Sequence, residues 1–225
     1  MHTWMLEAPE HEVTPADLAV FAAAWDARDV GVLPGDLPRW LFLQWLTEQG
    51  YLLHGSQSGE LTELVGAQKE YGQADEFSNT IGVYAASDGL WAMMYALRGP
   101  EVAQQSDMAL QVLERGQWST MRYFMSVAPR TPGGQDARAL LASGFVYVLP
   151  RAGFAQSPPY DHDGLGHVQE AHWVNPHPVT PLLHIPVTPD DLPLPVCLHD
   201  AEQVKTRSKA DPWGFPWLAA TDDHA

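Results

Sequence analysis

Two short segments of this chain carry residue types that can hold a flat ring bearing an amide group. His54-Gly55-Ser56 ends one apolar run, and a second apolar run brings Tyr84, with Tyr95 further along. A glycine at the end of a strand lets a ring approach the backbone, whose N–H and C=O groups can pair with a primary carboxamide. Tyrosine faces attract an aromatic cation by stacking and by cation–π interaction. Together the segments predict a pocket for an amide-bearing ring.

Both segments resemble motifs of the ADP-ribosyltransferase superfamily, in its poly(ADP-ribose) polymerase and diphtheria toxin branch, the His-Tyr-Glu type. Residues 51–56 resemble the His-Gly-Ser/Thr motif on the first strand of that branch. Residues 82–95 resemble its second segment, in which one tyrosine ends a strand and another follows 11 residues later. The motif similarity covers about 45 residues, looser agreement in strand order extends to Val187, and the chain is similar to an uncharacterised bacterial group of this type.

The resemblance implies that NAD is the substrate. The nicotinamide–ribose bond would be cleaved and ADP-ribose moved to an unknown protein or small-molecule acceptor, or to water. His54 would then contact the adenosine-side ribose and Gly55 the carboxamide, while Tyr84 and Tyr95 enclose the nicotinamide. Ala92 would be the small residue that lets the ring enter. The implied NAD-binding residues are His54, Gly55, Ser56, Tyr84, Ala92 and Tyr95.

The resemblance also implies a catalytic glutamate at the start of a late strand, acting with His54 and Tyr84. Such a carboxylate holds the nicotinamide ribose and stabilises the oxocarbenium-like species as nicotinamide leaves, and buried electrostatic groups of this kind are often the largest catalytic term. His172 replaces the carboxylate if Trp173 takes the aromatic position that follows it, whereas Glu170 is catalytic if the register differs by two. Side chains alternate along a strand, so Glu170 and His172 share one face and both stay candidates.

Three function classes are open at this point. The first is an NAD-cleaving transferase with Glu170 as its catalytic residue. The second is a binding module of the same fold that lacks the carboxylate and holds NAD or ADP-ribose without turnover. The third is a structural or interaction protein whose pocket is filled by Trp25, Trp91 or Trp173. The position of Glu170 relative to the pocket separates the first class from the second.

Three histidines, His162, His167 and His172, are spaced five residues apart among carboxylates, and zinc uses such ligand types. The first two lie in a glycine- and proline-rich loop expected over residues 155–166. We interpret them as solvated loop histidines and expect no metal site. Further candidates for the cleft edge and for the pyrophosphate are Asp75, Glu76, Arg98 and Lys69.

A helical lead is expected before the strand-rich part of the chain. Thr14 as N-cap, Pro15 at the first helical position and Asp17 in the first turn predict one helix. A second helix should start near residues 36–38 and end at Gly50, a plausible C-cap. The tryptophans of this lead are interpreted as core residues.

Apolar runs after Gly50 predict several short strands. A further helix is expected to begin at the N-cap Ser87-Asp88. These elements favour an α+β fold, and the resemblance makes it an ADP-ribosyltransferase-like split β-sandwich with an N-terminal helical lead. The expected domains are a helical lead over 1–49, an ADP-ribosyltransferase-like domain over 50–195 and a surface tail packed by aromatics, Trp213 to Trp217, over 196–225. The expected strands are 51–54, 81–86, 118–127, 144–149, 168–174 and 182–187.

Composition limits the classes of partner. The formal net charge of −16 argues against non-specific nucleic-acid binding, which relies on Lys and Arg neutralising phosphates. No apolar run approaches the ~20 residues of a membrane span, so no membrane partner is expected. The start of the chain has no secretion signal pattern, and Cys197 is the single cysteine among the 225 residues. These features predict a cytoplasmic protein.

Overall fold

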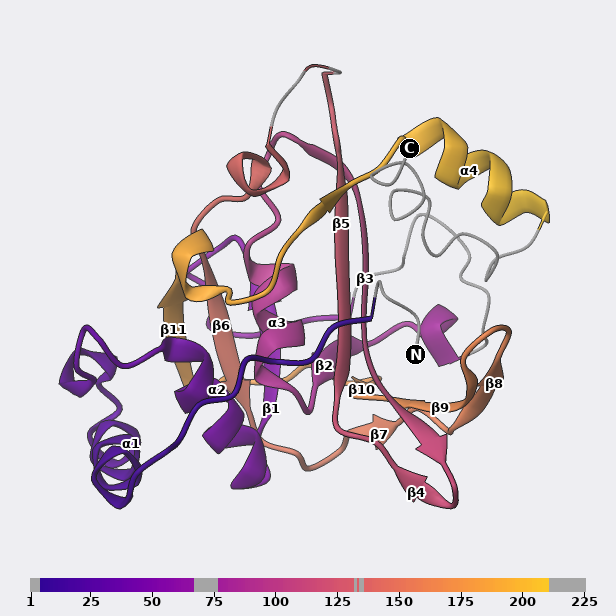
Figure 1. Ribbon diagram of the computed structural model, residues 1–225. Helices are drawn as coiled ribbons and strands as arrows, with labels where there is room; N and C mark the ends of the chain where they lie inside the picture. The colour runs from indigo at the N-terminus through magenta and orange to yellow at the C-terminus, as the bar shows by residue number, and fades with distance from the viewer. Residues whose placement is uncertain (1–4, 67–76, 132, 134–135, 211–225) are drawn as a thin grey trace.

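The computed structural model describes residues 5–66, 77–131, 133 and 136–210, and within them the chain belongs to the α+β class (Figure 1). The described strands form two sheets whose pairs are mostly antiparallel, together with four α-helices. The expected α+β class is therefore confirmed. None of the described helices has the length and apolar composition that crossing a bilayer requires.

The first sheet has the strand order β11-β6-β1-β2-β10-β7. β1 lies beside β6 along its whole length, with Leu52 opposite Leu149 and Ser56 opposite Phe145. On its other edge β1 meets β2 through a single pair, Leu53 and Ala86. The two strands diverge beyond that pair. The bounds are β1 Leu52–Ser56, β2 Val83–Ala86, β6 Gly144–Leu149, β7 Ala155–Gln156, β10 His172–Asn175 and β11 Leu183–Val187.

The second sheet has the order β12-β5-β3-β9-β8, and β4 pairs with β3 outside this path. The long strands β3 and β5 form its centre, and β12 lies parallel to β5. The bounds are β3 Val102–Glu114, β4 Gln117–Trp118, β5 Arg122–Pro129, β8 Tyr160–His162, β9 Gly166–Glu170 and β12 Cys197–Leu198.

The helices confirm most of the expected start signals. Thr14 caps the first helix through a capping box with Asp17. The second helix begins after Pro38 without a side-chain cap, and Gly50 follows its end with a φ of 89°. The α-helices are α1 Pro15–Ala27, α2 Arg39–Glu48, α3 Gly89–Ala96 and α4 Ala201–Ala210, and the 3-10 helices are η1 Val30–Val32, η2 Phe77–Asn79, η3 Ala137–Leu140 and η4 Pro189–Asp191.

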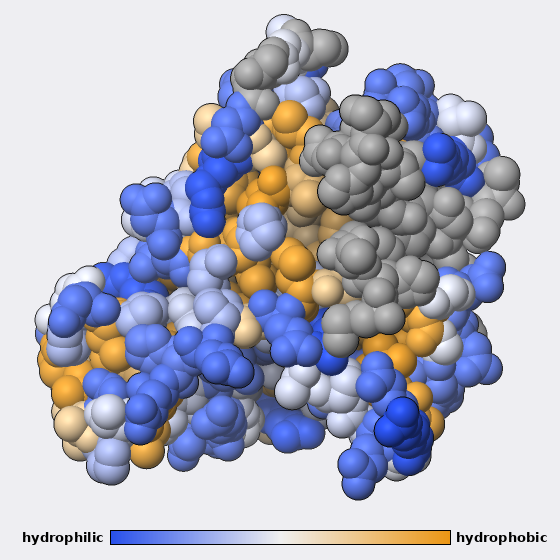
Figure 2. All heavy atoms as spheres, in the orientation of Figure 1, coloured by the Kyte–Doolittle hydropathy of each residue, from blue (hydrophilic) through white to orange (hydrophobic). Residues whose placement is uncertain are grey.

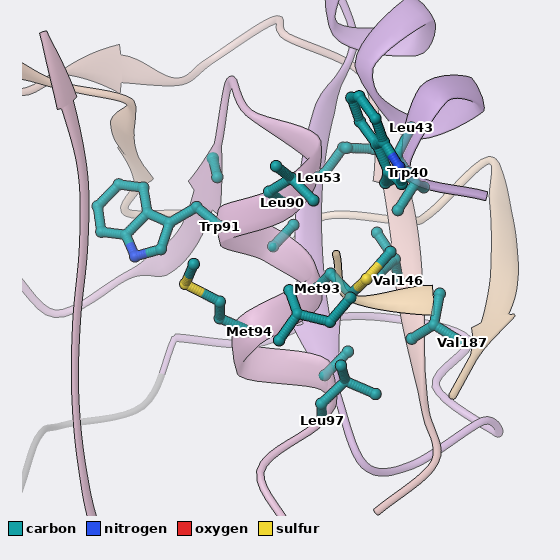
Figure 3. Packing of buried hydrophobic residues seen from close by; sticks show 14 of the residues in the cluster. Trp40, Leu43, Leu53, Leu90, Trp91, Met93, Met94, Leu97, Val146 and Val187 are labelled. Atoms are coloured by element: carbon teal, nitrogen blue, oxygen red, sulfur yellow. The ribbon is translucent and has the colours of Figure 1, made fainter. Parts of the chain in front are cut away.

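Helix α3 contacts strands of both sheets, namely β1, β2 and β6 of the first and β3 of the second. All its residues except Tyr95 are buried. Figure 3 shows Met93 directed toward Val146 and Val187, whereas Trp91 and Met94 point to the opposite side of the helix. Fully burying a side chain of this size contributes about 1.5–3 kcal/mol, so α3 is an apolar centre around which both sheets pack.

Asp88 fixes the start of α3. One carboxylate oxygen accepts the Trp91 backbone N–H at 2.9 Å, and the other accepts the Tyr123 hydroxyl at 2.7 Å. Tyr123 belongs to β5, so this buried side chain caps the helix and ties it to the second sheet. Burial raises the pKa of Asp88, although its hydrogen bonds act in the opposite direction.

The helices of the N-terminal lead share the core of the sheets. Phe21, Trp25 and Trp40 belong to the same buried cluster as α3, and Trp45 packs against it, which confirms the interpretation of these tryptophans as core residues. Leu18 of α1 is exposed, and Figure 2 shows hydrophobic residues at the surface around the N-terminal helices. Elsewhere in that view most of the outline is hydrophilic, and hydrophobic residues reach the surface near its centre.

Several expected elements differ from the structure. β3 was not expected, the strand expected over 118–127 is β4 and β5, and the loop expected over 155–166 holds β7, β8 and the start of β9. Ile81 is exposed and precedes β2. The segment expected as one strand over 168–174 is divided at Ala171 between β9 of the second sheet and β10 of the first. The aromatic segment Trp213 to Trp217 lies outside the described residues, and the domain boundaries stay a prediction.

Candidate functional site

A cavity of about 180 Å³ opens where β1 and β2 diverge. This is below the about 300–1,000 Å³ typical of pockets for drug-sized ligands, so it suits one ring of a larger molecule. Five of the six residues expected to bind NAD line it, and Ser56 does not. Its lining consists of Leu53, His54, Gly55, Tyr84, Ala85, Ala86, Trp91, Ala92, Tyr95 and His172.

His54 bridges the divergence between the two strands. Its Nδ1 lies 2.7 Å from the backbone carbonyl oxygen of Tyr84. A carbonyl only accepts, so Nδ1 must carry the proton. Burial lowers the pKa of His54, against the effect of that hydrogen bond, so the ring is neutral with Nε2 as an acceptor. If His54 contacts a ribose hydroxyl, as the resemblance implies, Nε2 would accept the hydrogen bond and the hydroxyl would donate it.

Gly55 is a glycine because α3 passes directly behind it. A Cβ at this position would lie 2.1 Å from the Ala92 carbonyl oxygen and 2.5 Å from the Ala96 backbone nitrogen. On the sheet side Gly55 lies opposite Val146 of β6, and the described pairing places no β2 residue opposite it. The missing side chain thus serves helix packing, while one edge of the backbone faces the cavity.

Tyr84 is held from behind by the loop that precedes β2. Its hydroxyl lies 2.9 Å from the Ser78 carbonyl oxygen and also contacts that of Thr80. Its ring faces that of His172, with centroids 5.1 Å apart and planes inclined by 31°. Because its hydroxyl is engaged elsewhere, Tyr84 offers the cavity its ring rather than a polar group.

Tyr95 and Ala92 come from α3 and lie on the wall formed by that helix. Tyr95 is about half exposed (49%), and its hydroxyl lies near two partly buried carboxylates, Asp107 and Glu170. Desolvation there, together with the charges of Asp107 and Glu170, raises the pKa of its phenol well above the usual value. Ser56 lies further along β1, where its Oγ accepts the Ser58 backbone N–H at 3.1 Å.

Glu170 and His172 approach each other across the change of sheet at Ala171. The His172 Nδ1 is 3.6 Å from a carboxylate oxygen of Glu170, so the two side chains lie close together although their strands belong to different sheets. His172 lines the cavity, and its buried Nδ1 has no hydrogen-bond partner among the described residues. Glu170 lies behind it, accepting the Tyr160 hydroxyl at 2.8 Å. Of these two groups, His172 lines the cavity and Glu170 does not.

Asp107, on β3, belongs to the site although no sequence motif identifies it. The Trp91 Nε1–H donates to one of its oxygens at 2.5 Å, and the Gln105 side chain donates to the other at 2.9 Å. Tyr95 also hydrogen-bonds to it. Burial raises the pKa of Asp107, and the nearby Glu170 charge adds to this. An aspartate in a strand of mixed polarity gives no local signal, since its role depends on contacts with α3.

The tryptophans expected as alternatives to fill the pocket do not do so in the described structure. Trp91 forms one wall, Trp25 packs against Tyr51, and Trp173 lies under Arg151. The third function class, based on a filled pocket, therefore has no support from these residues.

The histidines considered for zinc do not converge. His162 is buried, which corrects its interpretation as a solvated loop residue, and its Nδ1 contacts the Asp163 carbonyl oxygen at 2.7 Å. His167 pairs with Asp161 at 2.8 Å. Within the described ranges no three His, Cys, Asp or Glu residues are grouped as metal ligands would be. The candidates Lys69, Asp75 and Glu76 lie outside the described residues.

Comparison of the chain with protein-family models, with curated proteins and with solved structures finds no match in any of the three. Function therefore has to be inferred from the geometry of the site.

Proposed function

We propose that this protein is an NAD-dependent ADP-ribosyltransferase with the split β-sandwich fold of that superfamily. The observation that supports it most is the convergence of His54, Gly55, Tyr84 and Tyr95 on one ring-sized cavity. These residues come from two segments that lie apart in sequence, and the motif of each segment independently predicts contact with the same ring. The divergence of β1 from β2 leaves backbone at Gly55 open to a carboxamide.

In the proposed reaction the carboxamide pairs with the backbone at Gly55 and the ring lies against Tyr84 and Tyr95. The bond between the ribose C1′ and the ring nitrogen breaks, and its electron pair goes to that nitrogen. Neutral nicotinamide leaves, and positive charge develops on the ribose. Glu170 stabilises that charge until the acceptor, or water, adds to C1′ and loses a proton.

The diphosphate would leave the cavity on the side of Tyr95. Arg98 follows α3, is exposed, and is close enough to lower the pKa of the Tyr95 phenol. Its Nη2 makes one 3.3 Å bond to the Ala103 carbonyl oxygen. We propose Arg98 as a cation for the diphosphate, and backbone N–H groups as the remaining donors.

A second candidate function is a catalytically inactive module that binds NAD or ADP-ribose. The observation in its favour is that His172, not Glu170, lines the cavity, and that the Glu170 carboxylate is already engaged by Tyr160. Ligand binding would have to reposition Glu170 for turnover. The two candidates share the pocket and differ only in whether Glu170 reaches the ribose.

Glu170→Gln separates the two candidates. We expect it to retain NAD binding, because the shape and the Tyr160 contact are kept, and to lose nicotinamide release by about 10²–10³-fold, because the stabilising charge is gone. Release is measured chromatographically and NAD binding by calorimetry in the same buffer. The control is Glu114→Gln, which removes one charge from an exposed residue at the far end of β3.

The wild-type result decides between the proposals. Release that Glu170→Gln abolishes and Glu114→Gln preserves supports the transferase. Binding without release supports the inactive module. Absence of NAD binding by the wild-type protein would reject both.

A further inference from the structure

Two carboxylates lie directly behind the aromatic walls of the cavity. Asp107 accepts the Trp91 indole N–H and hydrogen-bonds to the Tyr95 hydroxyl, so it contacts two wall residues at once. Glu170 interacts electrostatically with both Asp107 and Tyr95. These carboxylates therefore act on the cavity through its walls.

No Lys or Arg in the described part of the chain forms an ion pair with either carboxylate. The described ion pairs place only His172 near Glu170, at 3.6 Å, and none involves Asp107. Among the described residues, those that line the cavity include neither Lys nor Arg. A ring in the cavity therefore faces aromatic surfaces backed by two acidic groups, with the exposed Arg98 acting on Tyr95.

We propose that this pocket selects a cationic ring over a neutral ring of the same shape, and that Asp107, acting through Trp91 and Tyr95, sets the preference. The inference rests on the proposed function, since the pyridinium of NAD is such a ring, and it adds Asp107 as a positioning and specificity-determining residue. Asp107 is not among the residues that line the cavity, so it does not touch the bound ligand ring.

The physical basis is the electrostatics of the walls. Tryptophan is the best aromatic partner for a cation, and the attraction grows where water is excluded. An indole whose N–H donates to a carboxylate is polarised, so its face becomes more negative. The carboxylate charge also acts directly on the ring through a medium less polar than water.

Selection by charge has a consequence for turnover. Cleavage moves the bonding electron pair onto the ring nitrogen, so the pyridinium becomes neutral nicotinamide. The product loses the attraction that held the substrate while keeping nearly the same shape. Asp107 therefore favours release of nicotinamide as well as binding of NAD.

The test compares two probes that differ in one ring atom. 1-Methylnicotinamide carries a permanent positive charge, and 3-methylbenzamide has the same outline with carbon in place of the charged nitrogen. We expect the wild-type protein to bind the cation about tenfold more tightly than the neutral probe, measured by calorimetry. Equal affinities, or no binding of the cation, would overturn the inference.

Asp107→Asn keeps the size of the side chain and an acceptor for the Trp91 indole while it removes the charge. We expect the ratio of the two affinities to fall several-fold in this variant, with little change in the affinity for the neutral probe. Asp26→Asn, at an exposed position of α1, is the matched control and should keep the wild-type ratio. If Asp107 has only a structural role, the substitution will lower the affinity for both probes equally, and that result would contradict the proposal.

A pH series on the wild-type protein tests the same point if Asp107→Asn fails to fold. Neither probe titrates, so a change in the affinity ratio reports the site. Protonation of Asp107 on acidification removes its negative charge from behind Trp91 and Tyr95, so the ratio must fall as pH is lowered. A ratio independent of pH would overturn the inference. The other groups that face Asp107 and Glu170 are Trp91, Tyr95, Gln105, Tyr160 and His172, and Arg98 acts on Tyr95.

The inference and the proposed function fail in different ways. If the protein releases nicotinamide from NAD but binds both probes equally, the transferase stands and charge selection is wrong. If the cation is preferred but NAD is neither bound nor cleaved, charge selection stands and the cavity serves another cationic ligand.

Discussion

At the scale of single residues, Gly55 shows how one position can meet two demands. The closeness of α3 already forbids a side chain there, whatever the cavity holds. In the sequence, His-Gly-Ser indicates ligand chemistry, and the structure adds a packing reason that sequence alone does not reveal. The glycine alone is therefore weaker evidence for a ligand than its convergence with Tyr84 and His54.

Replacing Gly55 with alanine should destabilise the fold. The added Cβ would lie 2.1 Å from the Ala92 carbonyl oxygen, so α3 must shift, at a cost of about 3 kcal/mol. Denaturant unfolding measures the loss. Gly35→Ala is the control, because nothing lies within 4 Å of its added Cβ and the change should leave stability nearly unaltered. Equal stability of the two variants would show that α3 yields easily at Gly55.

The residues of the site differ in how far sequence could identify them. His54, Tyr84 and Tyr95 stand in motifs with a recognisable order, and the structure brings them to one cavity. Asp107 could not be found in this way, because its importance comes from hydrogen bonds to α3 rather than from neighbours in sequence. The choice between Glu170 and His172 also needed a structure, since the alternation of a single strand places both on one face.

At the scale of elements, the sequence predicted the helices and strands whose capping residues or apolar patterns lie within their own segments. The capping box at Thr14 and the buried runs of β1 and β6 are examples. β3 carries Gln, Ser and Asp in its first half and is stabilised by its two neighbours, β5 and β9, so its local pattern is weak. The division at Ala171 is decided by tertiary contacts, because the segment has strand-like residues on both sides and local sequence does not mark a break.

His199 connects the segment after β12 to the centre of the second sheet. Its Nδ1 lies 2.8 Å from the Ser126 Oγ, and its Nε2 lies 3.4 Å from the Gln104 side-chain oxygen. Burial lowers the pKa of His199 to about 4, although Asp200 nearby acts to raise it. The neutral ring is therefore the form that fits the folded protein.

This pKa predicts a pH dependence of stability. An unfolded histidine titrates near about 6.5, so the stabilisation is fully present above that value and is lost as pH falls toward about 4. His199→Gln should remove this part of the dependence, so its unfolding midpoint should fall less than that of wild type between pH 7 and pH 4. His177→Gln, at an exposed position, should follow wild type. Parallel curves for His199→Gln and wild type would contradict the assignment.

At the scale of the whole molecule, the N-terminal helices belong to the common core. Phe21, Phe42, Leu43 and Leu46 are buried almost completely in the cluster that includes α3. At about 1.5–3 kcal/mol for each such side chain, their burial is comparable to the total of about 5–15 kcal/mol that stabilises a typical domain.

Deleting residues 1–49 should therefore abolish cooperative folding of the remainder. We expect the truncated chain to lack the sharp thermal transition of the full chain, as followed by circular dichroism, because its sheets lose the apolar cover that α2 provides. A truncated chain with a single sharp transition would show that the helical lead is an independent addition.

The change of sheet at Ala171 takes place within one residue. Its N–H donates to the Ala109 carbonyl oxygen at 3.1 Å, and its own carbonyl oxygen accepts the Ser87 N–H at 2.9 Å. A surface loop accommodates an inserted or deleted residue at a small free-energy cost, but this one-residue connection between the sheets cannot. A gain or loss of one codon here would turn either Glu170 or His172 to the opposite face. Substitutions are compatible with the structure around Ala171, but insertions and deletions are not, because the two sheets fix the number of residues there.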